Sequence, residues 1–355
     1  MPKNEKFKEE NFLKFLKLVS PGTPLREGLK VILQADTGGL IVVGDTEKVL
    51  GTIEGGFKVN CWLTPTSLAE LAKMDGAIIL SEDIKRILYA NTELVPDYLI
   101  PTGERGTRHR AAERMAKQTG CPVIAISQSR RTISLYQGNL KYVLKTLPEL
   151  VSKANQALQT LEGYRATFHE VLTQLELLEF QDEVRLLDVV RVIQRGQIMK
   201  KIKEEIEGYV VELGEEARLI EMQLKEIIGN ALHENRHIIR DYGKKDYGRT
   251  LRELEEISVE ELLDLTNITD VLGYGKSSEN LDLSVFPRGY RILSRIPHLP
   301  SAVIENVVKD LGDLSSIMNS TALELTEINK VGERRANSIK RELERLRDRA
   351  LLVRR

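Results

Sequence analysis

The sequence predicts three parts: an α/β N-terminal domain with a central mixed sheet, an all-α middle and an all-α C-terminal domain. Eight of the eleven prolines lie between Pro2 and Pro148, and residues 149–286 contain none. Because proline breaks helices, that long stretch, which is rich in Leu, Glu, Lys and Gln, favours helix. Before it, short apolar runs alternate with helical stretches, as in α/β domains. The predicted domains are therefore 1–148, 149–285 and 286–355.

The composition excludes several classes of protein. The chain carries 52 Lys and Arg against 53 Asp and Glu, so its net charge of −1 gives no overall attraction to nucleic acid. Any DNA binding must come from a local patch. Cys61 and Cys121 lie outside CxxC spacing, which excludes a disulfide scaffold and a thiolate zinc cluster. No uncharged apolar run approaches the roughly 20 residues that span a bilayer, and charges interrupt the N-terminus, so we expect a cytoplasmic protein without a membrane partner.

Five short apolar runs in the N-terminal part are predicted to be buried strands. They cover residues 40–43, 77–80, 87–89, 123–126 and 133–136. One helix is predicted over 67–74, with Thr66 as its N-cap and Glu70 bonding back to it. A second is predicted over 108–119, where Gly120 and Pro122 stop it. Strands and helices interleaved in this way favour one main sheet.

The middle part repeats apolar residues at spacings of three and four, as an amphipathic helix does. The repeats are Val151, Ala154, Leu158 and Leu161, then Val171, Leu175 and Leu178. Residues 202–228 mix apolar positions with dense charge and indicate a solvated helix without chemistry. Residues 273–277 read GYGKS, but a P-loop needs glycine where Asp270 stands, so the segment is predicted to be a surface turn.

The segment Asp75-Gly76-Ala77 lies where a predicted helix ends and a predicted strand begins. Junctions of this kind hold ligand-binding groups in α/β sheets. Glycine lets a ligand approach the backbone closely, and aspartate oxygens suit a hard divalent cation. A tight turn without function is the competing interpretation.

Residues 103–110, GERGTRHR, combine a glycine-containing loop with the start of the 108–119 helix. Thr107 is expected to cap that helix, and Arg108, His109 and Arg110 lie in its first turn. Cations there oppose the helix dipole, so their placement indicates that an anion binds at this end. Free amides, a hydroxyl and guanidiniums together describe a polyphosphate site. A solvated basic turn with a structural His109 is the alternative.

The segment Ser127-Gln128-Ser129-Arg130-Arg131 connects two predicted strands. Tight hairpin turns more often contain Asn-Gly or Asp-Gly, so Ser127 and Arg130 become candidates for holding terminal phosphates. An ordinary hairpin connection is the alternative interpretation of this segment.

Together, these three motifs resemble the diadenylate cyclase domain. The segments KMDGAIILS (73–81), ILYAN (87–91) and AERMAKQTG (112–120) add to the resemblance. VELGEEARL (211–219) and PRGYRIL (287–293) resemble the DNA integrity scanning family of DisA type. The resemblance covers nearly the whole chain and all three parts in order, so the chain is identified as a member of that family.

Residues 325–339, LTEINKVGERRANSI, resemble a helix-hairpin-helix, in which backbone amides meet a DNA phosphate without reading the bases. Residues 296–300, followed by 303–311, are expected to form a companion half-motif. The last 23 residues hold nine Lys or Arg and four Asp or Glu, which makes this end basic. The predicted DNA contacts are Lys330, Val331, Gly332, Arg334, Arg335, Lys340 and Arg341.

The resemblance implies a diadenylate cyclase that makes cyclic di-AMP from two ATP molecules and releases two pyrophosphates. Each 3′-hydroxyl attacks the α-phosphate of the other nucleotide, so two domains must face each other in a homo-oligomer, which is an octamer in this family. The resemblance implies that Asp75 holds Mg²⁺ or Mn²⁺, with His109 as a second metal contact. It also implies that Gly76 contacts the ribose and Leu94 the adenine of ATP. The implied phosphate contacts are Thr107, Arg108, His109 and Arg110. The outer phosphates are held by Ser127 and Arg130.

The chain departs from the family pattern in three places. Lys330 stands where the hairpin usually has its first glycine. Ala111, at the expected ATP site, stands where the family often has threonine, and Gln128 or Ser129 stands where it has a second arginine. Two alternatives therefore stay open, a DNA-binding scaffold with an inactive cyclase domain and a metal-dependent nucleotidyltransferase or ATPase with another product. The main hypothesis is that branched or damaged DNA, bound at the basic end of a nucleoid-associated protein, regulates synthesis.

Overall fold

The computed structural model describes residues 12–352, which form two compact units. Unit 1 holds the N-terminal part up to Ala154 together with Glu207–Ile220, and unit 2 holds Asn155–Ile206 together with the C-terminal part from Glu221. The middle and C-terminal parts thus share a compact unit, and the domain boundaries at 148 and 285 stay a prediction. Residues 1–11 lie outside the described residues. The expectation that charges interrupt any apolar run at the N-terminus concerns these residues in part.

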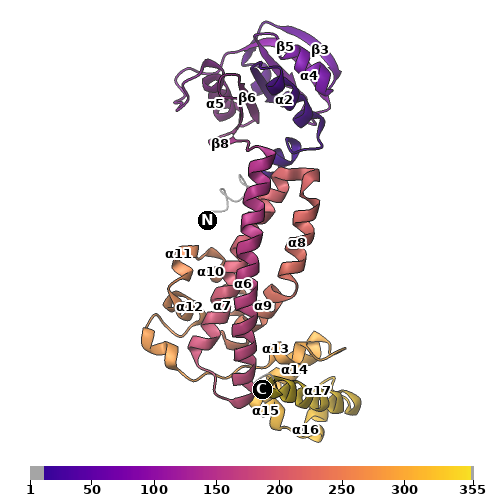
Figure 1. Cartoon of the computed structure of the whole chain (residues 1–355), viewed down its shortest axis with the longest axis vertical. Helices are drawn as coiled ribbons and strands as arrows, with labels where there is room; N and C mark the ends of the chain where they lie inside the picture. Colours follow the sequence, from indigo (N-terminus) through magenta and orange to yellow (C-terminus); the bar gives the residue numbers. More distant parts are fainter. Residues whose placement is uncertain (1–11, 353–355) are drawn as a thin grey trace. The chain divides into compact units, whose positions relative to one another are not determined.

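An eight-stranded mixed sheet forms the centre of unit 1 (Figure 1), as predicted. The strand order is β2-β5-β4-β1-β6-β7-β8, and β3 pairs with β5. Strands β1 and β4 are parallel, and the other neighbours are antiparallel. The strands are β1 (Gly39–Val43), β2 (Ile53–Glu54), β3 (Phe57–Trp62), β4 (Ala77–Leu80), β5 (Arg86–Leu94), β6 (Val123–Ser127), β7 (Thr132–Gln137) and β8 (Leu140–Val143). The sequence did not predict β2, β3 or β8.

Helices cover both faces of the sheet because alternate residues of its central strands point to opposite sides. Ile41 and Ile78 pack in one cluster with α2 (Pro24–Gln34) and α4 (Pro65–Leu71). Val42 and Ile79 pack in another cluster with α3 (Glu47–Leu50) and α5 (Thr107–Thr119). Strands β1 and β4 are therefore buried on both faces, which explains why their sequences are continuously apolar.

The predicted cap of helix α4 is wrong. The helix begins at Pro65, and its N-cap is Thr64, not Thr66. Thr64 Oγ1 accepts a hydrogen bond from the Ser67 amide at 3.0 Å, and Ser67 Oγ accepts one from the Thr64 amide at 3.0 Å. Proline suits the first helical position because it needs no donor there, so the cap precedes it. Glu70 forms an ion pair with the exposed Lys73 instead of bonding back to a cap.

Helix α5 also begins one residue earlier than predicted. Its N-cap is Gly106, which makes no side-chain cap hydrogen bond, and Thr107 is the first helical residue, so the prediction that Thr107 caps the helix is wrong. Its amides at the N-terminus are therefore not satisfied by a side-chain cap. Gly120 ends the helix in the left-handed conformation, with φ of 75°, as its position predicted.

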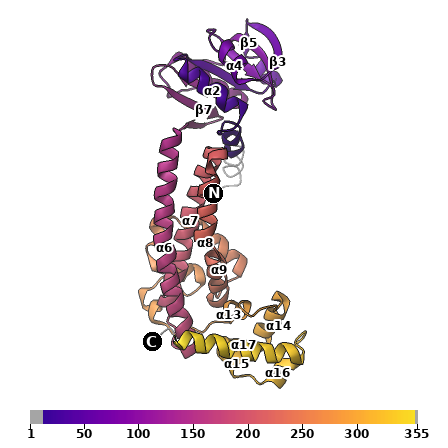
Figure 2. The same cartoon turned by 45° about the vertical axis from the view of Figure 1, so that its right-hand side comes forward.

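The middle part is helical, as predicted (Figure 2). Its elements are α6 (Leu147–Gln181), α7 (Leu186–Leu213), η1 (Gly214–Ala217), α8 (Arg218–Ile228), α9 (Ala231–Tyr242), α10 (Tyr247–Glu256), α11 (Val259–Leu262), α12 (Leu265–Leu272) and η2 (Ser278–Asp282). The helix expected over 202–228 is interrupted at η1, where Gly214 has φ of 55°. Residues 273–277 form a turn between α12 and η2, as predicted. Within residues 12–352, no helix is both long and apolar enough to cross a membrane.

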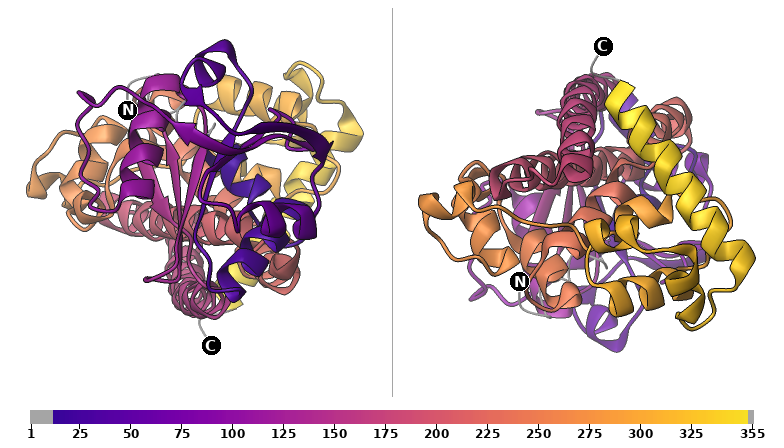
Figure 3. Two further views of the ribbon diagram at one scale, coloured as in Figure 1. Left: turned by 90° about the horizontal axis from the view of Figure 1, so that it is seen from above. Right: turned by 90° about the horizontal axis from the view of Figure 1, so that it is seen from below.

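Five helices form the C-terminal part: α13 (Tyr290–Ser294), α14 (Ser301–Leu311), α15 (Leu314–Asn319), α16 (Ala322–Glu327) and α17 (Glu333–Leu352). Figure 3 (right) shows α17 in yellow beside the shorter helices. Each helix contributes to one buried cluster, through residues such as Ile292, Val307, Ile317, Leu325 and Ile339. The short helices are thus held by a shared core and do not depend on their own length for stability.

Two hairpins in this part, α13–α14 and α16–α17, have the same backbone geometry. His298 and Lys330 occupy corresponding turn positions, with left-handed φ values of 60° and 69°. After each turn, two amides reach back to one carbonyl: those of Val303 and Ile304 to Pro300, and those of Arg335 and Ala336 to Gly332. The segment 296–300, expected as a companion half-motif, therefore has the same backbone form as the segment around Lys330.

Candidate active site

A cavity of about 420 Å³ lies in unit 1 where α5 begins, beside the start of β4 and the end of β5. Six residues predicted for the ATP site line it together: Asp75, Gly76, Leu94, Thr107, Arg108 and Ala111. The sequence did not identify the remaining lining residues, which are Leu40, Ala77, Asn91, Thr92 and Glu93. These segments meet because β4 pairs with both β5 and β1 while α5 packs on the same sheet.

Gly76 is required by the close approach of two backbones. A Cβ atom at this position would lie 2.7 Å from the Thr92 amide nitrogen and closer still to the backbone of Asn91. Thr92 stabilises the contact between β5 and the start of β4, since its buried Oγ1 donates a hydrogen bond to the Ala77 carbonyl at 3.0 Å. The segment 75–77 is therefore held against β5, and this positions Asp75 at the cavity.

Asp75 and Arg108 form an open ion pair at the cavity. Nη2 of Arg108 lies 3.2 Å from Oδ1 of Asp75. The side chain of Arg108 is 40% exposed, and that of Asp75 is 100% exposed. An ion pair this exposed contributes little to stability because water screens it. The carboxylate is therefore available to a cation and the guanidinium to a phosphate.

Gly38 leaves the space that the Arg108 side chain occupies. A Cβ atom at Gly38 would lie 3.0 Å from Cζ of Arg108 and closer still to Nη1. Gly38 is not among the glycines with positive φ, so glycine is needed here for space and not for an unusual backbone conformation. In the sequence, Gly38 stands just ahead of the predicted strand 40–43, and no local pattern indicates this role.

The side chain of His109 joins a polar network away from the cavity lining. Its Nδ1 lies 2.9 Å from Oη of Tyr136, which donates to Oε1 of Glu104 at 2.9 Å, and Lys141 forms an ion pair with Glu104. A carboxylate only accepts, so the Tyr136 proton is directed to Glu104 and Nδ1 of His109 must donate to Tyr136.

Nε2 of His109 then carries the free lone pair, and it is buried without a hydrogen-bond partner. Burial lowers the pKa of His109, against the opposite effect of Glu104, so the ring is neutral near pH 7. The same network affects Glu104. Burial raises its pKa, but hydrogen bonds from Lys141 and Tyr136 outweigh burial and lower it. The result is a neutral imidazole with a fixed tautomer.

Besides His109, three predicted phosphate contacts lie outside the cavity lining. Arg110 is exposed on α5. Ser127 and Arg130 lie at the β6–β7 connection, where Ser127 Oγ accepts a hydrogen bond from the Arg130 amide at 3.3 Å. Arg130 and Arg108 both lower the pKa of His109 through their charges, so the hairpin and the start of α5 face the same region.

The donors at the cavity suit a divalent metal ion that is held largely by a ligand's phosphates. Asp75 provides one exposed carboxylate. Over residues 12–352, no group of three or more His, Cys, Asp or Glu side chains is arranged to hold a metal ion. Mg²⁺ commonly keeps several waters and binds through one or two carboxylates plus phosphate oxygens. One carboxylate therefore fits such an ion when a nucleotide supplies the remaining ligands.

The predicted DNA contacts differ in how freely they can reach a ligand. The exposed residues are Lys330, Gly332, Arg334, Arg335 and Arg341. Val331 is buried in the core, and Lys340 Nζ donates to the Met318 carbonyl at 2.6 Å. The exposed Arg335 also makes such a bond, from Nη1 to the Lys330 carbonyl at 2.7 Å. Lys330 adopts the left-handed conformation that glycine adopts without cost, which matches its position as the expected first glycine of the hairpin.

The chain is similar to known proteins over nearly its whole length. Residues 26–140 match the family described as DisA bacterial checkpoint controller nucleotide-binding, and residues 144–281 match the DisA bacterial checkpoint controller linker region. The chain is 53% identical to the DNA integrity scanning protein DisA of Carboxydothermus hydrogenoformans, over 96% of this chain and 98% of that protein. It is 49% identical to the DNA integrity scanning protein DisA of Clostridium kluyveri, over 97% of this chain and 98% of that protein. A solved structure of a double mutant of DacA from Staphylococcus aureus is 19% identical, covering 39% of this chain and 89% of that chain with a TM-score of 0.30.

Proposed function

The chain belongs to the DisA family of DNA integrity scanning proteins and is a diadenylate cyclase, and we propose that DNA bound at its C-terminal hairpins regulates synthesis of cyclic di-AMP. The reaction joins two ATP molecules and releases two pyrophosphates. The cavity where Asp75, Gly76 and Arg108 meet is the observation that carries the proposed active site.

The proposed nucleotide site has an apolar side and a positively charged side. Leu40 and Leu94 are apolar lining residues suited to adenine, and Gly76 allows the ribose to approach the backbone. Arg108, Thr107 and the free amides at the start of α5 bind phosphates. They hold the α-phosphate in line for attack, and positioning with charge neutralisation supplies most of the catalysis in phosphoryl transfer.

Diadenylate cyclases use a divalent metal ion, and the proposal names Mg²⁺ or Mn²⁺. Asp75 is the proposed metal ligand, with Nε2 of His109 as a second contact. When bound, the ion neutralises negative charge on the reacting phosphates. The hydrogen bond from His109 to Tyr136 supports this role, because it leaves Nε2 unprotonated.

The proposed reaction needs two chains. A cavity of about 420 Å³ is in the range for one small ligand, and each 3′-hydroxyl must reach the α-phosphate of another nucleotide. Two chains must therefore present their cavities to each other in a symmetric homo-oligomer, which we propose to be an octamer. Arg110, Ser127 and Arg130, outside the cavity lining, are proposed to hold the outer phosphates.

The DNA proposal rests on the two hairpins of the C-terminal part. The exposed residues Lys330, Gly332, Arg334, Arg335 and Arg341 are proposed to contact phosphates. Val331 and Lys340, whose side chains are engaged within the protein, support the hairpin. Contacts of this kind follow the shape of the DNA, so branched or damaged DNA is the proposed ligand. A cytoplasmic, nucleoid-associated location is part of the same proposal.

The substitution Asp75→Asn tests the active site. Wild-type protein incubated with ATP and Mg²⁺ or Mn²⁺ should release cyclic di-AMP and pyrophosphate, identified by chromatography and mass. The variant should be slower by about a hundredfold or more, because the metal loses its protein carboxylate. Asp45→Asn, at another exposed aspartate of unit 1, is the matched control and should keep the wild-type rate.

Three outcomes would contradict parts of this proposal. Equal rates in Asp75→Asn and the control would remove Asp75 from the site. A different nucleotide product would indicate another nucleotidyltransferase or an ATPase. If neither metal ion supports formation of a product, the alternative of a DNA-binding scaffold with an inactive cyclase domain would be favoured.

A further inference from the structure

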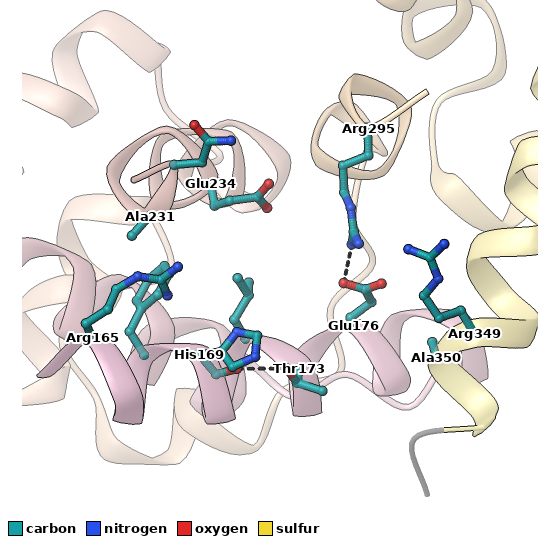
Figure 4. A pocket seen from close by; sticks show the side chains of 12 residues that line it. Arg165, His169, Thr173, Glu176, Ala231, Glu234, Arg295, Arg349 and Ala350 are labelled. Carbon is teal, nitrogen blue, oxygen red and sulfur yellow. Dashed lines mark hydrogen bonds and ion pairs between the residues drawn. The ribbon is translucent and has the colours of Figure 1, made fainter. Parts of the chain in front are cut away.

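Two cavities, one in each unit, differ in how far their polar groups are already engaged. The cavity of unit 2, of about 390 Å³, is shown in Figure 4. Its lining combines the cations Arg165, Arg295 and Arg349 with the carboxylates Glu176 and Glu234, and Arg295 forms an ion pair with Glu176. These charges largely compensate each other within the protein. The cyclase cavity of unit 1, in contrast, contains a polar side chain of β5 that is available to a ligand.

That side chain belongs to Asn91, whose backbone conformation is unusual for a strand. Its φ of 54° is left-handed, a conformation that asparagine tolerates better than most residues. Ala77 of β4 pairs with Thr92 of β5. Two residues further along β4, Ile79 pairs with Tyr89, which is three residues away on β5. The extra residue of β5 makes a β-bulge, and bulges redirect side chains and are frequent next to active sites.

Glycines on both sides enclose the backbone of Asn91. A Cβ atom at Gly56 would lie 2.6 Å from the Ala90 carbonyl oxygen and 2.9 Å from the carbonyl carbon of Asn91. A Cβ atom at Gly76 would lie closer still to the backbone of Asn91. The neighbours Ala90 and Thr92 are buried, whereas Asn91 is exposed and lines the cavity. Close packing of three segments therefore fixes the place where Asn91 meets the cavity.

The side-chain amide of Asn91 is free to bind a ligand. Over residues 12–352, no protein group makes a hydrogen bond with it. Asn60 on β3 is also left-handed, with φ of 48°, but its Oδ1 accepts a hydrogen bond from Nε of Arg86 at 2.9 Å. Glycine would adopt the conformation of Asn91 at less cost, so the backbone alone does not account for an amide at this position.

Asn91 lies beside the place where the ribose of the proposed nucleotide approaches the protein. Its backbone is next to Gly76, the proposed ribose contact. Leu94, the proposed adenine contact, is three residues further along β5, or about 10 Å at 3.3 Å per residue. Glu93 also lines the cavity, but it is next to Leu94 and so lies nearer the base. The 2′-hydroxyl of a ribose both donates and accepts hydrogen bonds, and so does an asparagine amide.

We propose that the side chain of Asn91 binds the 2′-hydroxyl of ATP and makes the enzyme prefer ATP to 2′-deoxy-ATP. This inference rests on the nucleotide site of the proposed function. A site that bonds a substrate hydroxyl discriminates against the analogue that lacks it, because the protein group is then left without its partner. 2′-Deoxy-ATP keeps the 3′-hydroxyl that attacks the α-phosphate, so both nucleotides can react.

The ratio of kcat/KM for ATP to that for 2′-deoxy-ATP, measured with the full chain, tests the proposal. The wild type should favour ATP. Asn91→Gly keeps the left-handed backbone and lacks the amide, so its preference should fall by about threefold to tenfold, the effect of one hydrogen bond. Asn91→Asp keeps an acceptor for the hydroxyl and should retain more of the preference than Asn91→Gly. A purely structural role would change the rates with both nucleotides equally and leave the ratio as it is.

Asn60→Gly is the matched control, because it replaces the other left-handed asparagine of this sheet region, which is outside the cavity lining. It should keep the wild-type preference, and thermal unfolding should show that all three variants remain folded. Equal preference for ATP in Asn91→Gly and Asn60→Gly would overturn the proposal. So would a wild type that does not distinguish the two nucleotides.

Calorimetric titration with α,β-methylene-ATP and its 2′-deoxy form, in the presence of Mg²⁺, measures the same preference without turnover. The wild type should bind the ribose form more tightly, and Asn91→Gly should lose about the same factor as in the kinetics. This preference in a wild type that makes no cyclic di-AMP would uphold the role of Asn91 and contradict the proposed reaction. Synthesis of cyclic di-AMP with no such preference would do the reverse, and absence of binding would overturn both.

Discussion

Glycines set the geometry of the proposed active site at the scale of single residues. Gly76 allows the segment 75–77 to touch the backbone of β5, and Gly38 leaves room for the guanidinium of Arg108. The two glycines act in different ways. A side chain at Gly76 would meet backbone atoms, which cannot move aside cheaply. A side chain at Gly38 would mainly meet the end of the flexible Arg108 side chain, which can be displaced, and would lie 3.3 Å from the Ile126 carbonyl oxygen.

The substitution Gly38→Ala should therefore lower activity without unfolding the protein. The new methyl group should displace the Arg108 guanidinium from the cavity, and a displacement near 1 Å in a phosphate-binding group can cost about tenfold to a hundredfold in rate. Initial rates of cyclic di-AMP synthesis at several ATP concentrations measure this effect. Thermal unfolding should change little, since Gly38 does not have the positive φ that would strain an alanine.

The control is Gly103→Ala, where a Cβ atom would meet nothing within 4 Å. It should retain the wild-type rate. If Gly38→Ala were as active as this control, the proposed positioning of Arg108 would be wrong.

Helices α6, α9 and α13 are joined at the scale of elements by a buried charge cluster. Arg291 of α13 is fully buried and forms ion pairs with Glu179 and Glu176 of α6 and with Glu234 of α9. Burial alone would lower the pKa of Arg291, but the surrounding carboxylates outweigh it and raise the pKa, so the guanidinium stays charged. Tyr242 of α9 adds a hydrogen bond to Glu179 at 2.9 Å.

The substitution Arg291→Met should destabilise unit 2 strongly. It leaves carboxylates buried without their cation, and breaking a buried pair in this way costs about 3–5 kcal/mol. Chemical denaturation of the variant and the wild type measures the loss. Arg249→Met is the control, because Arg249 pairs with Glu253 on the exposed surface of α10, where water screens the pair, and its loss should leave the stability close to that of the wild type. Similar losses in both variants would show that the buried cluster has no special role.

At the scale of the whole molecule, the proposed active site and the proposed DNA hairpins belong to different compact units. Helix α6 is continuous and contributes residues to both. The C-terminal helices share their unit with the middle part, so a truncation near residue 290 would cut through a packed core. Substitutions on the hairpin surface therefore test coupling between DNA and synthesis more cleanly than truncation does.

The double substitution Arg334→Glu with Arg335→Glu should abolish the effect of DNA on synthesis. Both side chains are exposed at the start of α17, and reversing their charges should repel phosphates. A branched DNA should change the rate of cyclic di-AMP synthesis by the wild type, and the variant should keep its rate without DNA. Arg345→Glu with Arg347→Glu carries the same charge change further along α17. Equal loss of the DNA response in both double variants would contradict contact through the hairpin.

Much of the proposed site followed from short motifs, because Asp75, Gly76, Thr107 and Arg108 lie in segments whose chemistry is visible locally. The lining residues Asn91 and Thr92 did not, since their role depends on β5 pairing with β4. His109 at the phosphates and the metal stays a prediction, and the structure adds that its Nδ1 makes a hydrogen bond with Tyr136 on β7, which leaves Nε2 without a partner. A motif identifies the residue but not the direction of its side chain, which depends on packing against distant strands.

Among the elements, strands β2, β3 and β8 escaped prediction because they are short or largely exposed and lack a continuous apolar run. Helix α2 was also missed, although its sequence contains a usable signal. Thr23 caps it, Pro24 occupies its first position, and Leu25, Leu29 and Ile32 form its buried face. The strands needed their partners to be recognised, whereas capping and apolar periodicity alone indicate α2.

The sequence by itself determined the fold class, the helical middle, the main buried strands and the motifs of the cyclase. These depend on local properties, namely the absence of proline, the period of apolar residues and the residue types within one turn. Only the tertiary structure decided that Gly38 makes room for Arg108, that Arg291 gathers three carboxylates, and that Arg165 and Arg349 share a cavity. Each of these depends on packing between segments far apart in the chain, which no local pattern records.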